Sequence, residues 1–196
     1  MNKQSDQPLI ALAQKGDMSA YEKLVDNYKH MVFTLTFRLV GNREDAEEVA
    51  QDTFLKVYSA LASFKGDSKF STWLYKIAYR KGLDCLKKRR SLPKTKEFDK
   101  DIRSIIPLTT EIWNDLEIRE RRNTIKSAIE KLANEDSVLI TLFYYEELSL
   151  VEISDIMDIE TNTVKVKLHR ARKKLASILR NSLEPETIHN YEGTRR

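Results

Sequence analysis

Apolar residues recur at intervals of three and four along most of the chain, the spacing that gathers them on one side of an α-helix. The pattern runs from residue 8 to about residue 92, breaks between residues 93 and 112, and resumes from residue 113 to about residue 181. The alternating pattern typical of strands does not stand out. We therefore predict an all-α fold with two helical domains joined by a flexible linker, the second containing a helix-turn-helix.

The predicted domains span residues 1–92 and 113–182, and a tail follows at residues 183–196. Between the domains, residues 93–112 contain Pro93, Pro107, mixed charges and a few irregularly spaced apolar residues. Proline interrupts helices, and such a composition is typical of connecting segments. We interpret residues 93–112 as the linker.

Within the first domain, turn and cap residues divide the helices. Gly16-Asp17 ends a first helix, and Gly41-Asn42 ends a second that continues towards Leu39. Glycine accepts the left-handed conformation that ends helices, whereas Asp and Asn side chains cap the next helix. Asp17 or Ser19 can cap the second helix and Asn42 the third.

The third predicted helix has an apolar face and an acidic face. Its apolar face contains Ala46, Ala50, Thr53, Phe54, Val57 and Leu61, and its acidic face contains Asp45, Glu48, Gln51 and Asp52. Such an acidic face is either solvated or a docking surface for a basic protein. Because it would repel DNA, we expect nucleic acid to bind elsewhere.

A loop centred on Lys65 to Ser68 precedes a fourth helix, which carries Gly82 in the middle of its apolar face. Glycine inside a helix costs about 1 kcal/mol relative to alanine, so close packing against another helix would explain it. The opposite face carries Trp73, Ile77, Arg80, Lys87 and Lys88. Cations and aromatic rings suit single-stranded nucleic acid, since rings stack on unpaired bases. Phe64, Phe70 and Trp73 could equally be core residues, and the pattern leaves both interpretations open.

Near the end of the second domain, residues 149–157 predict a short helix, residues 158–162 a turn, and residues from about 161 to 180 a longer helix. The apolar face of the longer helix contains Val164, Leu168, Ala171, Leu175 and Ile178. Residues 161–180 contain seven cations and no acid. In a helix-turn-helix, the second helix enters the major groove, where Lys, Arg and Asn read base edges. Asp158 occupies a turn position that is commonly Gly, and Asp tolerates the left-handed conformation. The alternative interpretation is a solvated basic helix.

Composition and charge exclude several classes of function. The chain has 196 residues, a net charge of +4, and one cysteine, Cys85, which can form no internal disulfide. The polar N-terminus is no secretory signal and the apolar stretches are too short to span a bilayer, so we expect a cytoplasmic protein without membrane insertion. The three histidines, His30, His169 and His189, are far apart. No phosphate loop, metal spacing or nucleophile motif is present, so we expect no enzyme activity, cofactor, metal or small-molecule substrate.

The chain resembles the extracytoplasmic-function sigma factors, the small two-domain members of the sigma-70 family. The resemblance covers residues 6 to 181 and depends on three motifs in the family's order. Residues 45–54 resemble the polymerase-binding helix, residues 64–74 the promoter-opening loop, and residues 163–175 the recognition helix. It implies a transcription initiation factor that binds core RNA polymerase and promoter DNA. It also implies an anti-sigma factor as partner.

The resemblance implies three sets of site residues. The polymerase-binding set is Asp45, Glu48, Gln51 and Asp52. The minus-ten set is Phe64, Lys65, Ser68, Phe70, Trp73, Ile77, Arg80, Lys87 and Lys88. The minus-thirty-five set is Asn162, Thr163, Lys165, Val166, His169, Arg170 and Lys173. The chain differs from many members at Arg80, where Asn is common, and at Glu160, where Ser is common.

An alternative is a stand-alone helix-turn-helix transcription regulator. It predicts tight operator binding without polymerase. It leaves the acidic face and the segment from Phe64 to Arg90 without a role.

Overall fold

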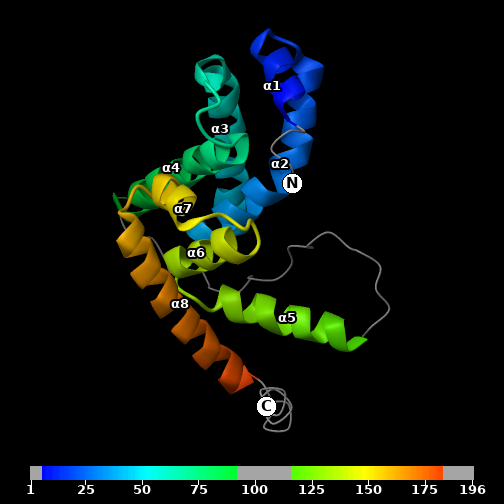
Figure 1. The fold of residues 1–196 in the computed structure, drawn as a ribbon. Helices are drawn as coiled ribbons and strands as arrows, with labels where there is room; N and C mark the ends of the chain where they lie inside the picture. The colour runs from blue at the N-terminus through cyan, green and yellow to red at the C-terminus, as the bar shows by residue number, and fades with distance from the viewer. Residues whose placement is uncertain (1–5, 92–115, 183–196) are drawn as a thin grey trace, which may run out of the picture.

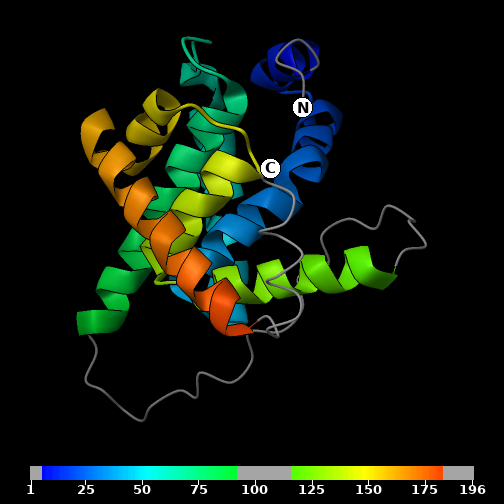
Figure 2. The ribbon, with the colours of Figure 1, turned by 60° about the horizontal axis from the view of Figure 1, so that its bottom comes forward.

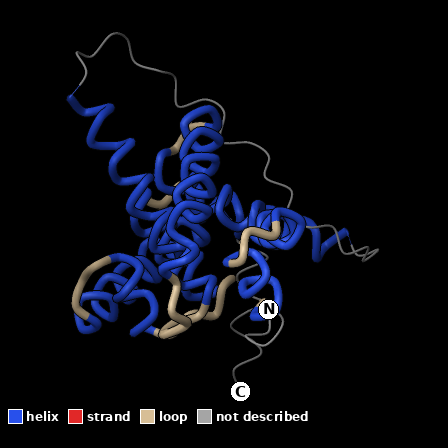
Figure 3. Tube along the Cα trace, turned by 90° about the horizontal axis from the view of Figure 1, so that it is seen from above, coloured by secondary structure: helices blue, strands red, loops and turns tan. Residues whose placement is uncertain are grey.

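The described residues of the chain form helices joined by short loops (Figures 1 and 3). The computed structural model describes residues 6–91 and 116–182, in which no strand occurs. The predicted linker, residues 93–112, and the predicted tail, residues 183–196, lie outside the described residues. The helices are α1 Gln7–Gln14, α2 Met18–Val40, α3 Arg43–Ala60, the short 3-10 helix η1 Leu61–Ser63, α4 Phe70–Ser91, α5 Leu116–Glu130, α6 Asn134–Tyr144, α7 Leu150–Met157 and α8 Thr161–Ser182. The predicted all-α class is confirmed.

The first helices begin and end where cap chemistry predicts. The Asp17 side chain accepts a hydrogen bond from the Ala20 backbone N–H at 3.1 Å, which caps α2. Gly41 ends that helix in the left-handed conformation, with φ of 83°. The Asn42 side chain then accepts from the Asp45 N–H at 2.9 Å and caps α3. Both predicted helix boundaries are therefore confirmed.

Helices α2, α3 and α4 pack against one another in the N-terminal part. Gly82 lies where α4 crosses α2, and a methyl group at this position would lie 2.5 Å from Cδ2 of Leu39. Only glycine leaves room for so close an approach without movement of the leucine side chain. The close helix packing predicted at Gly82 is confirmed.

The C-terminal part contains the predicted helix-turn-helix. Ser149 caps α7, and its side chain and that of Glu152 form a reciprocal capping box. Asp158 ends α7 in the left-handed conformation, with φ of 57°. Helix α8 begins three residues later, at Thr161, and Val164, Leu168 and Ala171 on its apolar face are buried. This turn is what sets α8 at an angle to α7 (Figure 1).

The N-terminal and C-terminal parts pack against each other directly. Helix α6 contacts α2, and α7 contacts α4 (Figures 1 and 2). Buried residues of both parts, among them Leu24, Leu74, Ile140 and Ile156, belong to one continuous hydrophobic cluster. The sequence predicts two domains and gives no sign of this contact. The contact determines which faces of α4 remain accessible.

Candidate protein-binding and nucleic-acid interfaces

The acidic face of α3 is accessible over most of its length. Glu48, Gln51 and Asp52 are exposed. Asp45 differs, because it is half-buried and its carboxylate accepts hydrogen bonds from Asn42 at 2.6 Å and from Arg89 at 3.2 Å. Asp45 therefore helps to hold α4 against the start of α3. Asp52 pairs with Lys81 of α4 at 3.5 Å and keeps an exposed side chain, so Glu48, Gln51 and Asp52 offer the accessible surface.

An exposed leucine extends this surface. Leu55 lies four residues after Gln51 and three after Asp52, so it shares their face of α3, and its side chain is 69% exposed. Sequence analysis did not single out Leu55, although its spacing from the acidic residues was the available signal. An apolar side chain next to carboxylates is a composition that suits contact with another protein better than contact with DNA.

The aromatic residues around the loop before α4 form a cluster. Phe64 and Phe70 are buried, at 8% and 6% exposure, and their ring centroids lie 5.6 Å apart. The Trp73 ring is half-buried, 5.1 Å from Phe64 and 5.8 Å from Phe70. The structure thus places Phe64 and Phe70 in the core and leaves Trp73 partly exposed at the edge of the cluster. At the loop tip, Lys65 is exposed and Ser68 is half-buried.

The basic face of α4 is met by acidic residues of α7. Arg80, Lys87 and Lys88 are exposed as predicted, and Ile77 is half-buried. Three ion pairs cross from this region to α7: Lys69 with Glu152 at 2.9 Å, Lys76 with Asp155 at 2.5 Å, and Arg80 with Asp158 at 3.7 Å. We name Lys69, Lys76 and Arg80 the basic row, and Glu152, Asp155 and Asp158 the acidic row. Of the basic row, sequence analysis identified Arg80 alone.

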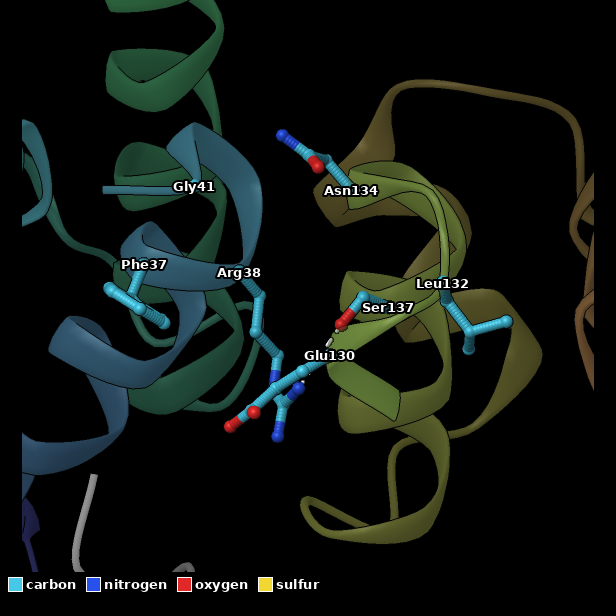
Figure 4. A pocket seen from close by; sticks show the side chains of 7 residues that line it. All are labelled: Phe37, Arg38, Gly41, Glu130, Leu132, Asn134 and Ser137. Carbon is cyan, nitrogen blue, oxygen red and sulfur yellow. Dashed lines mark hydrogen bonds between the residues drawn. The ribbon is translucent and has the colours of Figure 1, made fainter. Parts of the chain in front are cut away.

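Hydrogen bonds join the two parts beside the ion pairs. Buried Tyr75 in α4 donates a hydrogen bond to the carboxylate of Glu146, which follows α6, and burial raises the pKa of Glu146. Where α2 meets α6, a small pocket is lined by both helices, and Arg38 donates to Ser137 Oγ at 3.1 Å across it (Figure 4). Asn134 donates to the Leu39 carbonyl at 2.6 Å. The α2–α6 and α4–α7 contacts are therefore each tied by polar groups as well as by apolar packing.

The outward face of α8 is free of the rest of the described chain. All seven residues of the predicted minus-thirty-five set are exposed: Asn162, Thr163, Lys165, Val166, His169, Arg170 and Lys173. They recur at intervals of three and four residues, so they lie on one side of α8.

Other cations of α8 have a structural role. Lys167 and Lys174 form ion pairs with Glu135 and Asp136 of α6, at 2.8 Å and 2.6 Å. Arg172 lies over the rings of Phe143 and Tyr144, 5.1 Å and 5.4 Å from their centroids. Sequence analysis counted these three among the seven cations of residues 161–180 and gave them no role in the fold. The structure divides them, since these three hold α8 to α6.

No group of metal-binding side chains occurs in residues 6–91 and 116–182. Within the same ranges, no helix has the length and apolar character needed to cross a bilayer. Cys85 is half-buried, and burial raises the pKa of its thiol, so it is a poor nucleophile at neutral pH.

Comparison with known proteins identifies both parts of the chain. The family described as Sigma-70 region 2 matches residues 24–92, and that described as Sigma-70, region 4 matches residues 122–175. The ECF RNA polymerase sigma factor SigW of Bacillus subtilis is 35% identical over 181 residues, covering 88% of this chain and 95% of SigW. The ECF RNA polymerase sigma-E factor of Escherichia coli K12 is 34% identical over 177 residues, covering 87% of this chain and 92% of sigma-E.

Solved structures share the fold. CnrH, in complex with the cytosolic domain of CnrY, matches 91% of this chain and 99% of its own, with a TM-score of 0.62 and 22% identity. RpoE of Bartonella quintana, in complex with the anti-sigma factor NepR, matches 82% and 96%, with a TM-score of 0.61 and 19% identity. The stand-alone regulator is not favoured, because it gives no role to residues 24–92. The chain belongs to the extracytoplasmic-function sigma factors of the sigma-70 family, the initiation factors that direct RNA polymerase to promoters.

Proposed function

We propose that the chain binds core RNA polymerase through α3, contacts the minus-ten element through the loop at residues 64–69 and the basic face of α4, and reads the minus-thirty-five element with α8. The observation that carries this proposal is the separation of charge: an acidic face on α3, and basic faces on α4 and α8. Carboxylates repel phosphates, so α3 is left for a protein partner.

The polymerase contact is proposed for Glu48, Gln51 and Asp52, with Leu55 beside them. These four side chains are exposed and lie within two turns of one helix. An apolar residue inside a charged surface gives an interface a desolvated centre, while the charges set orientation and association rate. Asp45 is proposed to act indirectly, by fixing α4 against α3 through Arg89.

The contact with duplex DNA is proposed for the first four turns of α8. Lys165, Arg170 and Lys173 are exposed, and no carboxylate lies in α8. Basic side chains release counterions from phosphates, so this contact should weaken steeply with salt. Asn162 and Thr163 lie at the N-terminal end, the part of a recognition helix that contacts base edges.

The minus-ten contact is proposed to combine exposed basic side chains with the aromatic cluster beneath the loop. The side chains of Lys65, Arg80, Lys87 and Lys88 are exposed and can meet phosphates. Phe64 and Phe70 support the loop from below, with Trp73 at the edge of their cluster. We propose that this aromatic cluster is the wall of a base pocket rather than an exposed stacking platform.

We also propose an anti-sigma factor as regulatory partner, no catalytic role for the chain itself, and action in the cytoplasm. Two neighbours of the same fold are described in complexes with the cytosolic domain of CnrY and with NepR. The absence of a catalytic role is supported by membership of a family of transcription initiation factors. The cytoplasm is where the core polymerase and chromosomal DNA of a bacterium meet.

Transcription in vitro tests the proposal. Purified core RNA polymerase is supplied with genomic fragments, with and without the chain, and transcripts with defined starts are expected only when it is present. The variant with Glu48→Lys and Asp52→Lys should lose assembly with core polymerase, and Glu22→Lys, a charge reversal at an exposed position of α2, should retain it. If the double reversal assembles as well as the unmodified chain, the polymerase contact is not on α3.

A further inference from the structure

Helix α1 lies beside the loop that joins α3 to α4 (Figures 1 and 2). Its last residue, Gln14, directs its side-chain amide at the backbone where that loop begins. The Nε2 atom donates to the carbonyl of Leu61 at 3.0 Å and to the carbonyl of Phe64 at 2.9 Å. A glutamine amide has two N–H donors, so both of them are used on this segment of backbone.

The chain stops being helical at Phe64, which is why these carbonyls need an outside donor. Leu61 begins the short helix η1, and Phe64, at its end, has an extended backbone with φ of −72° and ψ of 110°. The last carbonyls of a helix have no donor within that helix. The carbonyl of Leu61 also accepts the N–H of Phe64 at 3.0 Å, and Gln14 adds a second bond there. Gln14 therefore fixes the direction in which the backbone leaves η1 and enters the loop.

The start of α1 reaches the other end of the same loop through Tyr28 of α2. The buried carboxylate of Asp6, the residue before α1, accepts a hydrogen bond from the Tyr28 hydroxyl. The Tyr28 ring packs edge-on against Phe70, the first residue of α4, with 5.5 Å between the ring centroids. Because Phe64 and Phe70 bound the loop at its two ends, α1 supports both of them.

The bonds of Gln14 are not what holds α1 on the protein. Ile10 and Ala13 of α1 are buried in the main hydrophobic cluster, whereas Gln14 is exposed. A hydrogen bond at an exposed position adds little to overall stability, because water competes for the same donor and acceptor. The bonds of Gln14 decide instead the local path of the backbone at Phe64.

We propose that Gln14 is a positioning residue for minus-ten recognition, whose two hydrogen bonds hold the start of the loop in the conformation that receives an unpaired base. The loop continues through exposed Lys65 and through Gly66, which has φ of 82°. Glycine leaves the backbone many conformations, so a fixed start reduces the ordering that base capture costs. This inference depends on the role proposed above for the loop at residues 64–69.

Transcription with core RNA polymerase, on a promoter mapped by transcription in vitro, tests the proposal. Each base pair of the two promoter elements is substituted in turn, and the ratio of transcripts from the original and substituted promoters measures discrimination at that position. Gln14→Glu keeps the shape of the side chain but replaces its donor with an oxygen that repels both carbonyls. Discrimination should fall about tenfold at the base that enters the loop, and stay unchanged elsewhere in the minus-ten and minus-thirty-five elements.

Two variants separate positioning from charge and from general damage. Gln14→Lys restores a donor of similar reach and should recover most of the discrimination that Gln14→Glu loses. Gln7→Glu adds the same charge at the exposed start of α1 and should discriminate as the unmodified chain does. Since discrimination is a ratio between two promoters for one protein, a uniform change in DNA affinity or in the folded fraction cancels.

Tryptophan fluorescence reports the start of the loop independently. The ring of Trp73 lies 5.1 Å from that of Phe64, and Trp113→Phe leaves Trp73 as the sole tryptophan of the chain. In that background Gln14→Glu should shift the emission of Trp73 to longer wavelength and increase its quenching by acrylamide, because Phe64 is held less firmly against it. Gln14→Lys and Gln7→Glu should leave the emission unchanged.

The proposal is overturned if Gln14→Glu discriminates among minus-ten bases as the unmodified chain does. A loss spread evenly over both promoter elements, or a loss that lysine at this position does not restore, also overturns it. Transcripts from the unmodified chain alongside any of these results would leave a sigma factor whose loop does not need Gln14. Absence of transcripts from the unmodified chain would instead remove the proposed function, and this inference with it.

Discussion

Replacing Gly82 with alanine should destabilise the fold when position 39 is leucine and stabilise it when position 39 is alanine. A methyl group at Gly82 would lie 2.5 Å from Cδ2 and 3.3 Å from Cγ of Leu39, whereas carbon atoms in contact ordinarily lie about 3.5–4.0 Å apart. Leu39 has no exposed surface, so its side chain cannot move into solvent. The added methyl group must therefore either push the Leu39 side chain into a strained position in the core or move α2 and α4 apart.

Two opposing contributions set the change in the free energy of unfolding. Overpacking a core costs about 1–3 kcal/mol, and replacing glycine by alanine inside a helix gains about 1 kcal/mol. Gly82→Ala should therefore lower the free energy of unfolding by about 1 kcal/mol. Leu39→Ala should cost about 2–5 kcal/mol, because it leaves a cavity. In that background the methyl group fills space, and Gly82→Ala should raise stability by about 1 kcal/mol.

Urea unfolding, followed by the circular dichroism of the helices, measures all four combinations. The linear extrapolation of each curve gives the free energies, and the double-mutant cycle gives the coupling between the two positions. Ala176→Gly, at an exposed position of α8, serves as a control for helix propensity and should cost about 1 kcal/mol. Equal effects of Gly82→Ala with Leu39 and with alanine at that position would refute the argument from close helix approach.

Three further predictions follow from the contacts described above. Burial raises the pKa of Glu146 in the folded chain, so its proton stabilises the fold as pH falls from neutral towards the ordinary carboxyl value; Glu146→Gln should abolish that component of the pH dependence of urea unfolding. Ser149→Ala removes the cap of α7 and should lower the free energy of unfolding by about 1 kcal/mol in the same assay. An unchanged free energy would show that the capping box does not stabilise the fold. Lys165→Ala and Arg170→Ala should each weaken promoter binding by the holoenzyme by about 1–3 kcal/mol if they read bases, measured by fluorescence anisotropy. Lys167→Ala, whose side chain pairs with α6, should change promoter binding far less, and equal losses would contradict the division of cations on α8.

The sequence by itself determined the helical class and the boundaries of the helices that have clear cap residues. Asp17, Asn42 and Ser149 cap the helices that follow them, and Gly41 and Asp158 end helices in the left-handed conformation. These features depend on residues within a few positions of one another, because a cap joins a side chain to the first N–H groups of its own helix. The exposed face of α8 was predictable for the same reason, since the spacing of a helix's apolar residues defines which side is left for solvent.

The tertiary structure alone decided which predicted site residues are free. Asp45 and Arg89 are separated by 44 residues, Lys167 and Glu135 by 32, and Lys76 and Asp155 by 79. Helical periodicity places a charge on a face and says nothing about which other helix meets that face. The aromatic residues of the loop show the same limit: a basic, aromatic segment is compatible with a base platform and with a core. The packing of Phe64 and Phe70 selects the core, because burying their rings removes more apolar surface from water than a solvated arrangement would.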